Sequence, residues 1–122
     1  MNLQREADQA MVPFLQHMRI KLVEEGASQD DIMKIAEALS YAVGAGIDSV
    51  DEGMVRGLRR KERGYAFEYF ALRAIAREHS GRIGNERLAD ILRGMAEETE
   101  QKLRPAQSRL GLDWLVPIKL ET

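Results

Sequence analysis

Apolar residues recur at helical spacing from the first turns of the chain. Between residues 11 and 26 they return every three or four positions, which places them on one face of a helix. This first stripe consists of Met11, Phe14, Leu15, Met18 and Leu22. Pro13 is expected to start or kink the helix, because proline lacks an N–H and its ring clashes with the preceding turn. Gly26 is expected to end it.

A second apolar stripe follows Ser28, which is a good N-cap residue and is followed by acidic residues in the first turn. The stripe consists of Ile32, Ile35, Ala36, Leu39 and Val43. Gly44 and Gly46 are expected to stop this helix, because each glycine costs about 1 kcal/mol relative to alanine in a helix interior.

A third helix is predicted from about residue 50 to His79, because Ser49 and Glu52 have the spacing of a capping box. Gly57 and Gly64 inside it are sites for a break or a close helix contact. Its apolar residues fall on two faces. One face holds Tyr65, Tyr69, Leu72 and Ala76, and the other holds Phe67, Phe70, Ala71 and Ala74. Such a helix packs between partners, inside a bundle or across a dimer interface.

The last stripe follows Asn85 and comprises Leu88, Ile91, Leu92, Met95, Thr99 and Leu103, with Pro105 interrupting or ending the helix. Beyond it, Trp114, Val116, Ile118 and Leu120 alternate with other residues, and Pro117 excludes a helix interior. The sequence therefore predicts an all-α fold. Residues 1–110 form a single bundle of four main helices, and residues 111–122 form an extended apolar arm packed on the bundle or on a partner subunit, with Trp114 as its anchor.

The stretch "RGYAFEYF" at residues 63–70 fits seven of the eight positions of the RNA-recognition octapeptide. That octapeptide lies on a β-strand beside a second aromatic strand, whereas the residues before it here have a helical period. Glu68 also stands where the strand carries a buried apolar residue, and an unpaired buried charge is costly. The stretch is therefore predicted to be helical and not an RNA-recognition motif.

The composition excludes several classes of site. The chain has no cysteine, and hence no disulfide, thiolate nucleophile or cysteine-based metal site. No apolar run approaches the roughly 20 residues that cross a bilayer. The charged N-terminal segment lacks the apolar stretch of a signal peptide. We therefore expect a cytoplasmic protein without a membrane-spanning segment.

Charge is distributed unevenly. Residues 1–52 hold 4 Lys/Arg against 10 Asp/Glu, and residues 53–122 hold 14 against 10. Five basic residues are concentrated within eight positions: Arg56, Arg59, Arg60, Lys61 and Arg63. This cluster is suited to gripping phosphate groups without reading sequence. The alternative is a solvated helix surface, or one that pairs with the acidic first half.

Motifs for catalysis are scarce. The two histidines, His17 and His79, lack the Glu at i−3 that di-iron bundles use, and no phosphate-binding loop or nucleophile elbow occurs. No metal or cofactor is therefore expected. The segment "LRAIAREHSGRIGNERLADIL" nevertheless resembles the Arg-x(4–6)-His segment of HEPN ribonucleases, small helical proteins that cleave RNA without metal and are usually dimeric. The resemblance implies that Arg73 holds the scissile phosphate and His79 transfers protons.

The leading hypothesis is a non-enzymatic helical adaptor or regulator that binds other proteins through apolar helix surfaces, as a homodimer and with a further, unidentified protein partner. The predicted partner-binding residues are Tyr65, Tyr69, Phe70, Leu72, Trp114, Val116 and Ile118. The alternative is an RNA-directed protein, either a HEPN-like ribonuclease using Arg73 and His79 or a phosphate-backbone binder using the basic cluster at residues 56–63.

Overall fold

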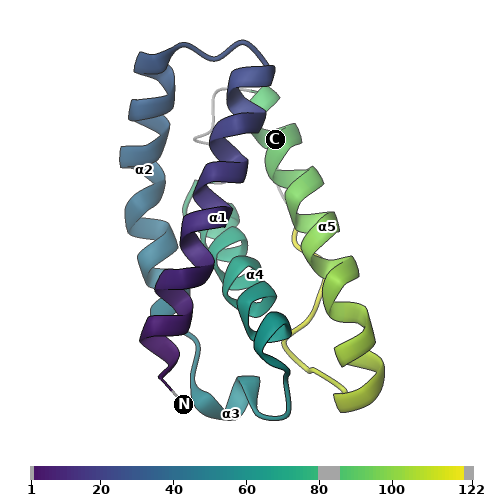
Figure 1. Ribbon diagram of the computed structural model, residues 1–122. Coiled ribbons are helices and arrows are strands. Elements are labelled where there is room, and N and C mark those ends of the chain that lie inside the picture. The colour runs from purple at the N-terminus through teal and green to yellow at the C-terminus, as the bar shows by residue number, and fades with distance from the viewer. Residues whose placement is uncertain (1, 80–85, 120–122) are drawn as a thin grey trace.

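A computed structural model describes residues 2–79 and 86–119 (Figure 1). Within these ranges the chain forms five helices and no strand, which confirms the predicted all-α class. The helices are α1 (Leu3–Glu24), α2 (Gln29–Asp48), α3 (Glu52–Val55), α4 (Arg60–His79) and α5 (Glu86–Leu110). Four of them are long and form the bundle, and α3 is a single turn.

Helix α4 is the centre of the bundle and packs against α1, α2 and α5. Figure 1 shows α1 and α2 side by side, with α4 behind α1 and α5 on the other side. This arrangement buries both apolar faces of α4, since Phe67, Tyr69, Leu72 and Ile75 are all fully buried. The two-faced pattern therefore reflects a helix inside the bundle.

The prediction that Gly44 and Gly46 stop the second helix is wrong, because α2 continues to Asp48. A Cβ atom at position 46 would lie 2.4 Å from the carbonyl oxygen of Phe70 in α4. Glycine is therefore present at this position to let two helix backbones approach, and the close packing outweighs its low helix propensity.

The predicted helix from residue 50 to His79 is divided in two. Asp51 begins α3 by accepting a hydrogen bond from the Met54 N–H at 2.9 Å, so the cap lies two residues after Ser49. Gly57 then adopts a φ of +86°, which favours glycine, and the chain turns before α4 starts. A break or a close helix contact was predicted at Gly57 and Gly64. Gly57 marks a break, whereas Gly64 lies inside α4, where an added Cβ would be 4.0 Å from the Cβ of Ala10 in α1.

Neither proline bounds a helix. α1 begins at the Asn2 cap, whose side chain accepts from the Arg5 N–H, and Pro13 lies in its interior. α5 runs through Pro105 and ends before Gly111, which has a φ of +62°. Both proline rings are exposed, so the carbonyl that each deprives of a donor can bond to water.

The C-terminal arm lies on the bundle of its own chain. The Trp114 indole N–H donates to the carbonyl oxygen of Met54 at 2.9 Å, and its ring packs 5.5 Å from that of Tyr69 and 5.0 Å from that of Phe70. The Tyr69 hydroxyl accepts from the Val116 N–H at 3.1 Å and has the Val116 carbonyl oxygen as an acceptor at 2.6 Å. The arm is thereby fixed across α4 by both side chains and backbone.

Candidate interaction surface

An apolar groove runs between α1 and α2, with a volume of about 430 Å³. Eight of the ten side chains that line it are apolar: Leu15, Met18, Leu22, Ile32, Ile35, Ala36, Leu39 and Val43, with Arg19 and Ser40 as the polar members. The two predicted apolar stripes thus face one another, but they do not close together. Leu15, a member of the first stripe, remains 48% exposed.

Exposed apolar residues extend the groove at its rims. Val12 is 58% exposed and shares one face of α1 with Leu15, three residues further along. Met33 is 60% exposed and shares one face of α2 with Ala36 and, a turn later, Ser40. A continuous apolar surface of this kind is typical of a site where another protein binds.

Most of the partner-binding residues predicted on α4 are buried inside the bundle. Tyr69, Phe70 and Leu72 are 0%, 5% and 2% exposed, because α1, α2, α5 and the arm cover them. Tyr65 is half-buried under Lys102, whose Nζ atom lies 5.1 Å from the ring centroid. The side chains of Tyr69, Phe70 and Leu72 are therefore covered within the chain itself, and most of the large exposed apolar residues lie on α1 and α2.

The predicted arm residues behave differently from one another. Trp114 and Ile118 are half-buried against the chain's own bundle, and the Ile118 N–H donates to Glu100 at 2.9 Å. Val116 is 47% exposed, although its backbone is bonded to Tyr69. Of the arm residues proposed to bind a partner, Val116 is therefore the most exposed.

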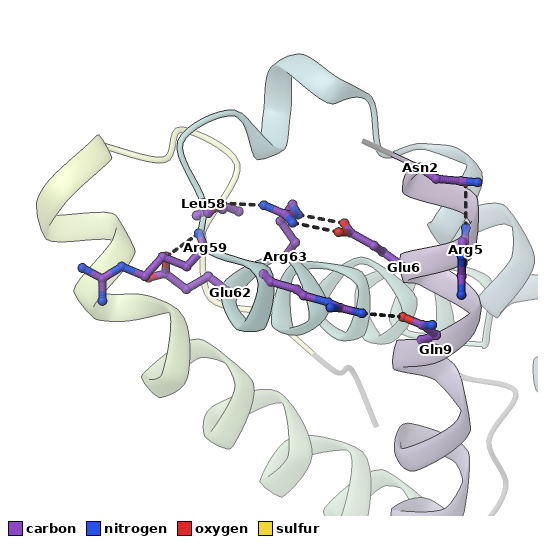
Figure 2. A network of polar contacts seen from close by, with 9 residues as sticks. Asn2, Arg5, Glu6, Gln9, Leu58, Arg59, Glu62 and Arg63 are labelled. Atoms are coloured by element: carbon purple, nitrogen blue, oxygen red, sulfur yellow. Dashed lines mark hydrogen bonds and ion pairs between the residues drawn. The ribbon is translucent and has the colours of Figure 1, made fainter.

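Part of the basic cluster is tied to α1 (Figure 2). Arg63 grips the Glu6 carboxylate with Nε and Nη2, both at 2.7 Å, and also donates to the Leu58 carbonyl at 2.9 Å. This two-pronged contact lowers the pKa of Glu6 and raises that of Arg63. Arg60 donates to Gln9 at 3.2 Å. These contacts are the pairing with the first half that the sequence left open.

The same region contains a second ion pair that fixes the start of α4. Glu62 accepts from the Arg59 N–H at 2.8 Å and from the Arg109 guanidinium at 2.6 Å. The hydrogen bond from Arg109 is the main cause of the lowered pKa of Glu62. The side chains of Arg56, Arg59 and Lys61 remain exposed. The cluster is therefore partly structural, and its use as a phosphate-backbone site stays a prediction.

The alternative catalytic pair is described only in part. Arg73 is half-buried on α4 and borders two cavities, both of which it shares with Arg77. The His79 side chain lies outside the described residues, so the distance between the two groups is not defined. The ribonuclease reading of Arg73 and His79 stays a prediction.

Sequence reasoning missed the rim of the groove, namely Val12, Arg19, Met33 and Ser40. One signal was present, since Val12 is apolar but lies outside the stripe of α1 and widens its apolar face. A second was the spacing of small residues at Ala36, Ser40 and Gly44, which leaves a smooth strip along α2. Neither pattern predicts that this strip of α2 is left exposed by the rest of the chain.

Within residues 2–79 and 86–119, no group of three or more His, Asp or Glu side chains lies close enough together to hold a metal ion. None of the helices in the same ranges has the length and apolar character needed to cross a membrane. Comparison of the chain with protein-family models, curated proteins and solved structures finds no match.

Proposed function

We propose that the protein is a non-enzymatic helical interaction protein that works as a homodimer, in which the groove between α1 and α2 is covered by a second copy of the chain. The observation that carries the proposal is the groove of about 430 Å³ with its apolar lining and exposed apolar rims. Burying such side chains is worth roughly 25 cal/mol per Å² of apolar surface, which favours association.

The sequence of α2 supports a second copy as the occupant. Along the outer side of the groove, the residues Met33, Ala36, Ser40, Gly44 and Ile47 form a strip that is nearly symmetric about Ser40. A twofold dimer buries the same patch on both subunits. If two α2 helices pack antiparallel at Ser40, Met33 faces the partner subunit's Ile47, and Ala36 faces the partner subunit's Gly44. Small residues then lie at the closest approach and larger ones fill both ends.

The size of the surface is suitable for a dimer. A helix of 20 residues is about 30 Å long, and two such helices side by side are about 20 Å wide. The face of α1 and α2 therefore offers on the order of 600 Å² per subunit, close to the roughly 800 Å² that each partner buries in a stable complex.

The test is the mass of the protein in solution for two matched variants. Ser40→Arg places two guanidinium groups at the proposed twofold axis, so we expect it to weaken the dimer at least tenfold. Tyr41→Arg adds the same charge one residue away, at a side chain that is 77% exposed and lies about 100° around the helix. This control should leave the dimer intact.

Sedimentation at micromolar concentration should show a dimer for the wild type and Tyr41→Arg, and mainly a monomer for Ser40→Arg, with unchanged helical circular dichroism. A wild-type protein that sediments only as a 13.8 kDa species would overturn the homodimer. If a different protein instead occupies the groove, that protein should bind the monomeric wild type, and its binding should be lost in Ser40→Arg.

The proposal includes a cytoplasmic location, because a chain without cysteine forms no disulfide that an oxidising compartment would maintain. Fractionation of cells that produce the tagged protein tests this point, and recovery in a secreted or membrane fraction would contradict it.

A further inference from the structure

Two arginines on α4 border a pair of cavities away from the α1–α2 groove. Arg73 and Arg77 are four residues apart and therefore lie on the same face of the helix. The arm-side cavity has a volume of about 320 Å³ and is bounded by residues 116–119 of the arm. The other, of about 300 Å³, is bounded by the last turns of α2 and by Met54. Both arginines line both cavities.

The charge of this site is unbalanced. Lys119 adds a third cation to the arm-side cavity, and among the described residues no carboxylate lines either cavity. Glu100, which influences the nearby Tyr69, does not line them and instead accepts from the Ile118 N–H. Arg73 and Arg77 make no hydrogen bond or ion pair with the described part of the chain.

Two other arginines of the chain, unlike Arg73 and Arg77, are paired with a carboxylate. Arg63 and Arg109 are each held by a glutamate, at 2.7 and 2.6 Å. A guanidinium offers five N–H donors in a fixed fork, and two such groups side by side match the oxygens of a phosphate. A single carboxylate would neutralise one of these cations, whereas a phosphate dianion neutralises two.

We propose that Arg73 and Arg77 bind the phosphate group of a small phosphomonoester, with Lys119 as a further charge and the apolar part of the ligand in the arm-side cavity. Ala76, Val116, Pro117 and Ile118 supply an apolar wall, which adjoins the fully buried Tyr69. A cavity of about 320 Å³ lies at the lower end of the range for small-molecule sites. The site therefore selects a compact ligand with one phosphate and an apolar body.

Calorimetric titration with 1-naphthyl phosphate tests the proposal, since this probe joins a phosphate to an apolar body of suitable size. We expect saturable binding by the wild type that is weakened at least tenfold in the double variant Arg73→Gln/Arg77→Gln. Because neither arginine forms an ion pair with residues 2–79 or 86–119, helical circular dichroism should not change. The matched control Arg56→Gln/Arg59→Gln removes the same charge from exposed positions and should bind within twofold of the wild type.

The apolar part of the ligand is tested separately. Inorganic phosphate and 1-naphthol, each alone, should bind at least tenfold more weakly than the joined probe. In a titration followed by nuclear magnetic resonance, the amide signals of Val116, Ile118 and Lys119 should shift and those of α1 should not. The latter signals distinguish this site from the proposed dimer groove.

Several outcomes would overturn the proposal. These are the absence of saturable binding, an equal loss in the Arg56/Arg59 control, or inorganic phosphate that binds as tightly as the probe. A short single-stranded RNA that binds through Arg73 and Arg77 more tightly than 1-naphthyl phosphate would replace the small ligand by a nucleic acid.

Discussion

Glu68 is a half-buried acidic residue on α4, close enough to Glu98 and Lys102 of α5 for their charges to affect it. Burial raises the pKa of its carboxyl group above the ordinary value of 4.5, with Glu98 acting in the same direction and Lys102 in the opposite one. In the RNA-recognition octapeptide this position is apolar and buried, so the charge indicated from sequence that the stretch is not a strand. The structure shows the consequence, a carboxyl group whose ionisation is made less favourable by burial.

The raised pKa leads to a pH-dependent prediction. Since the folded pKa exceeds the unfolded one, Glu68 does not oppose folding below pH 4.5, and its ionisation destabilises the fold as pH rises through the folded value. Glu68→Gln should therefore stabilise the protein at pH 7, by about 0.5 kcal/mol. The gain should disappear below about pH 4, where the wild-type carboxyl is protonated as well.

Urea denaturation at both pH values measures this difference. Glu97→Gln, at an exposed position on α5, controls for the loss of one negative charge. A Glu68→Gln variant that is less stable than wild type at pH 7 would show that the ionised carboxylate has a favourable role.

At the scale of helices, spacing alone predicted the number of long elements and most of their buried residues. Met11, Phe14, Met18 and Leu22 are buried on α1 as the stripe requires. The errors concern glycine and proline, whose effect depends on their surroundings. Pro13 and Pro105 face solvent and are tolerated, whereas Gly46 is required by a neighbouring helix. The residues around Gly46 do not show which helix will pack against it.

Two glycine substitutions separate propensity from packing. Gly46→Ala would place a Cβ atom against the backbone of Phe70, so we expect a loss of about 1–3 kcal/mol despite the better helix propensity of alanine. Gly94→Ala on α5 has no atom within 4 Å of the new Cβ and should gain up to about 1 kcal/mol. Thermal unfolding measures both. Equal stability of the two variants would mean that α2 and α4 can separate at no cost.

For the whole molecule, the arm completes a core that the four helices leave open. Leu112 joins Val55, Leu58, Ala66 and Ala106 in one buried cluster. Trp114 and Ile118 cover a second cluster, which consists of Tyr69, Phe70 and Leu103. The arm also lines one of the two cavities that Arg73 and Arg77 share. Docking of the arm thus provides both stability and the wall of the proposed anion site.

The candidate sites were harder to predict than the fold for a related reason. Periodicity identifies which side of a helix is apolar, but it does not say which neighbour covers that side. Tyr69 and Leu15 are both apolar-stripe residues, and the first is buried while the second lines an open groove. The arm-side cavity that Arg73 and Arg77 line likewise depends on where residues 116–119 pack, which no local sequence pattern specifies.

The arm is predicted to be held mainly through one ring. Trp114→Ala removes the indole that packs on Tyr69 and Phe70 and leaves the Met54 carbonyl without its donor, so we expect the free energy of unfolding to fall by about 3 kcal/mol. Val116→Ala is the matched control in the same arm. Its side chain is 47% exposed while its backbone makes the bonds to Tyr69, so it should cost less than about 1 kcal/mol. Urea denaturation followed by circular dichroism compares the two without relying on tryptophan fluorescence. Equal losses would mean that the backbone bonds to Tyr69, and not the indole, keep the arm on the bundle.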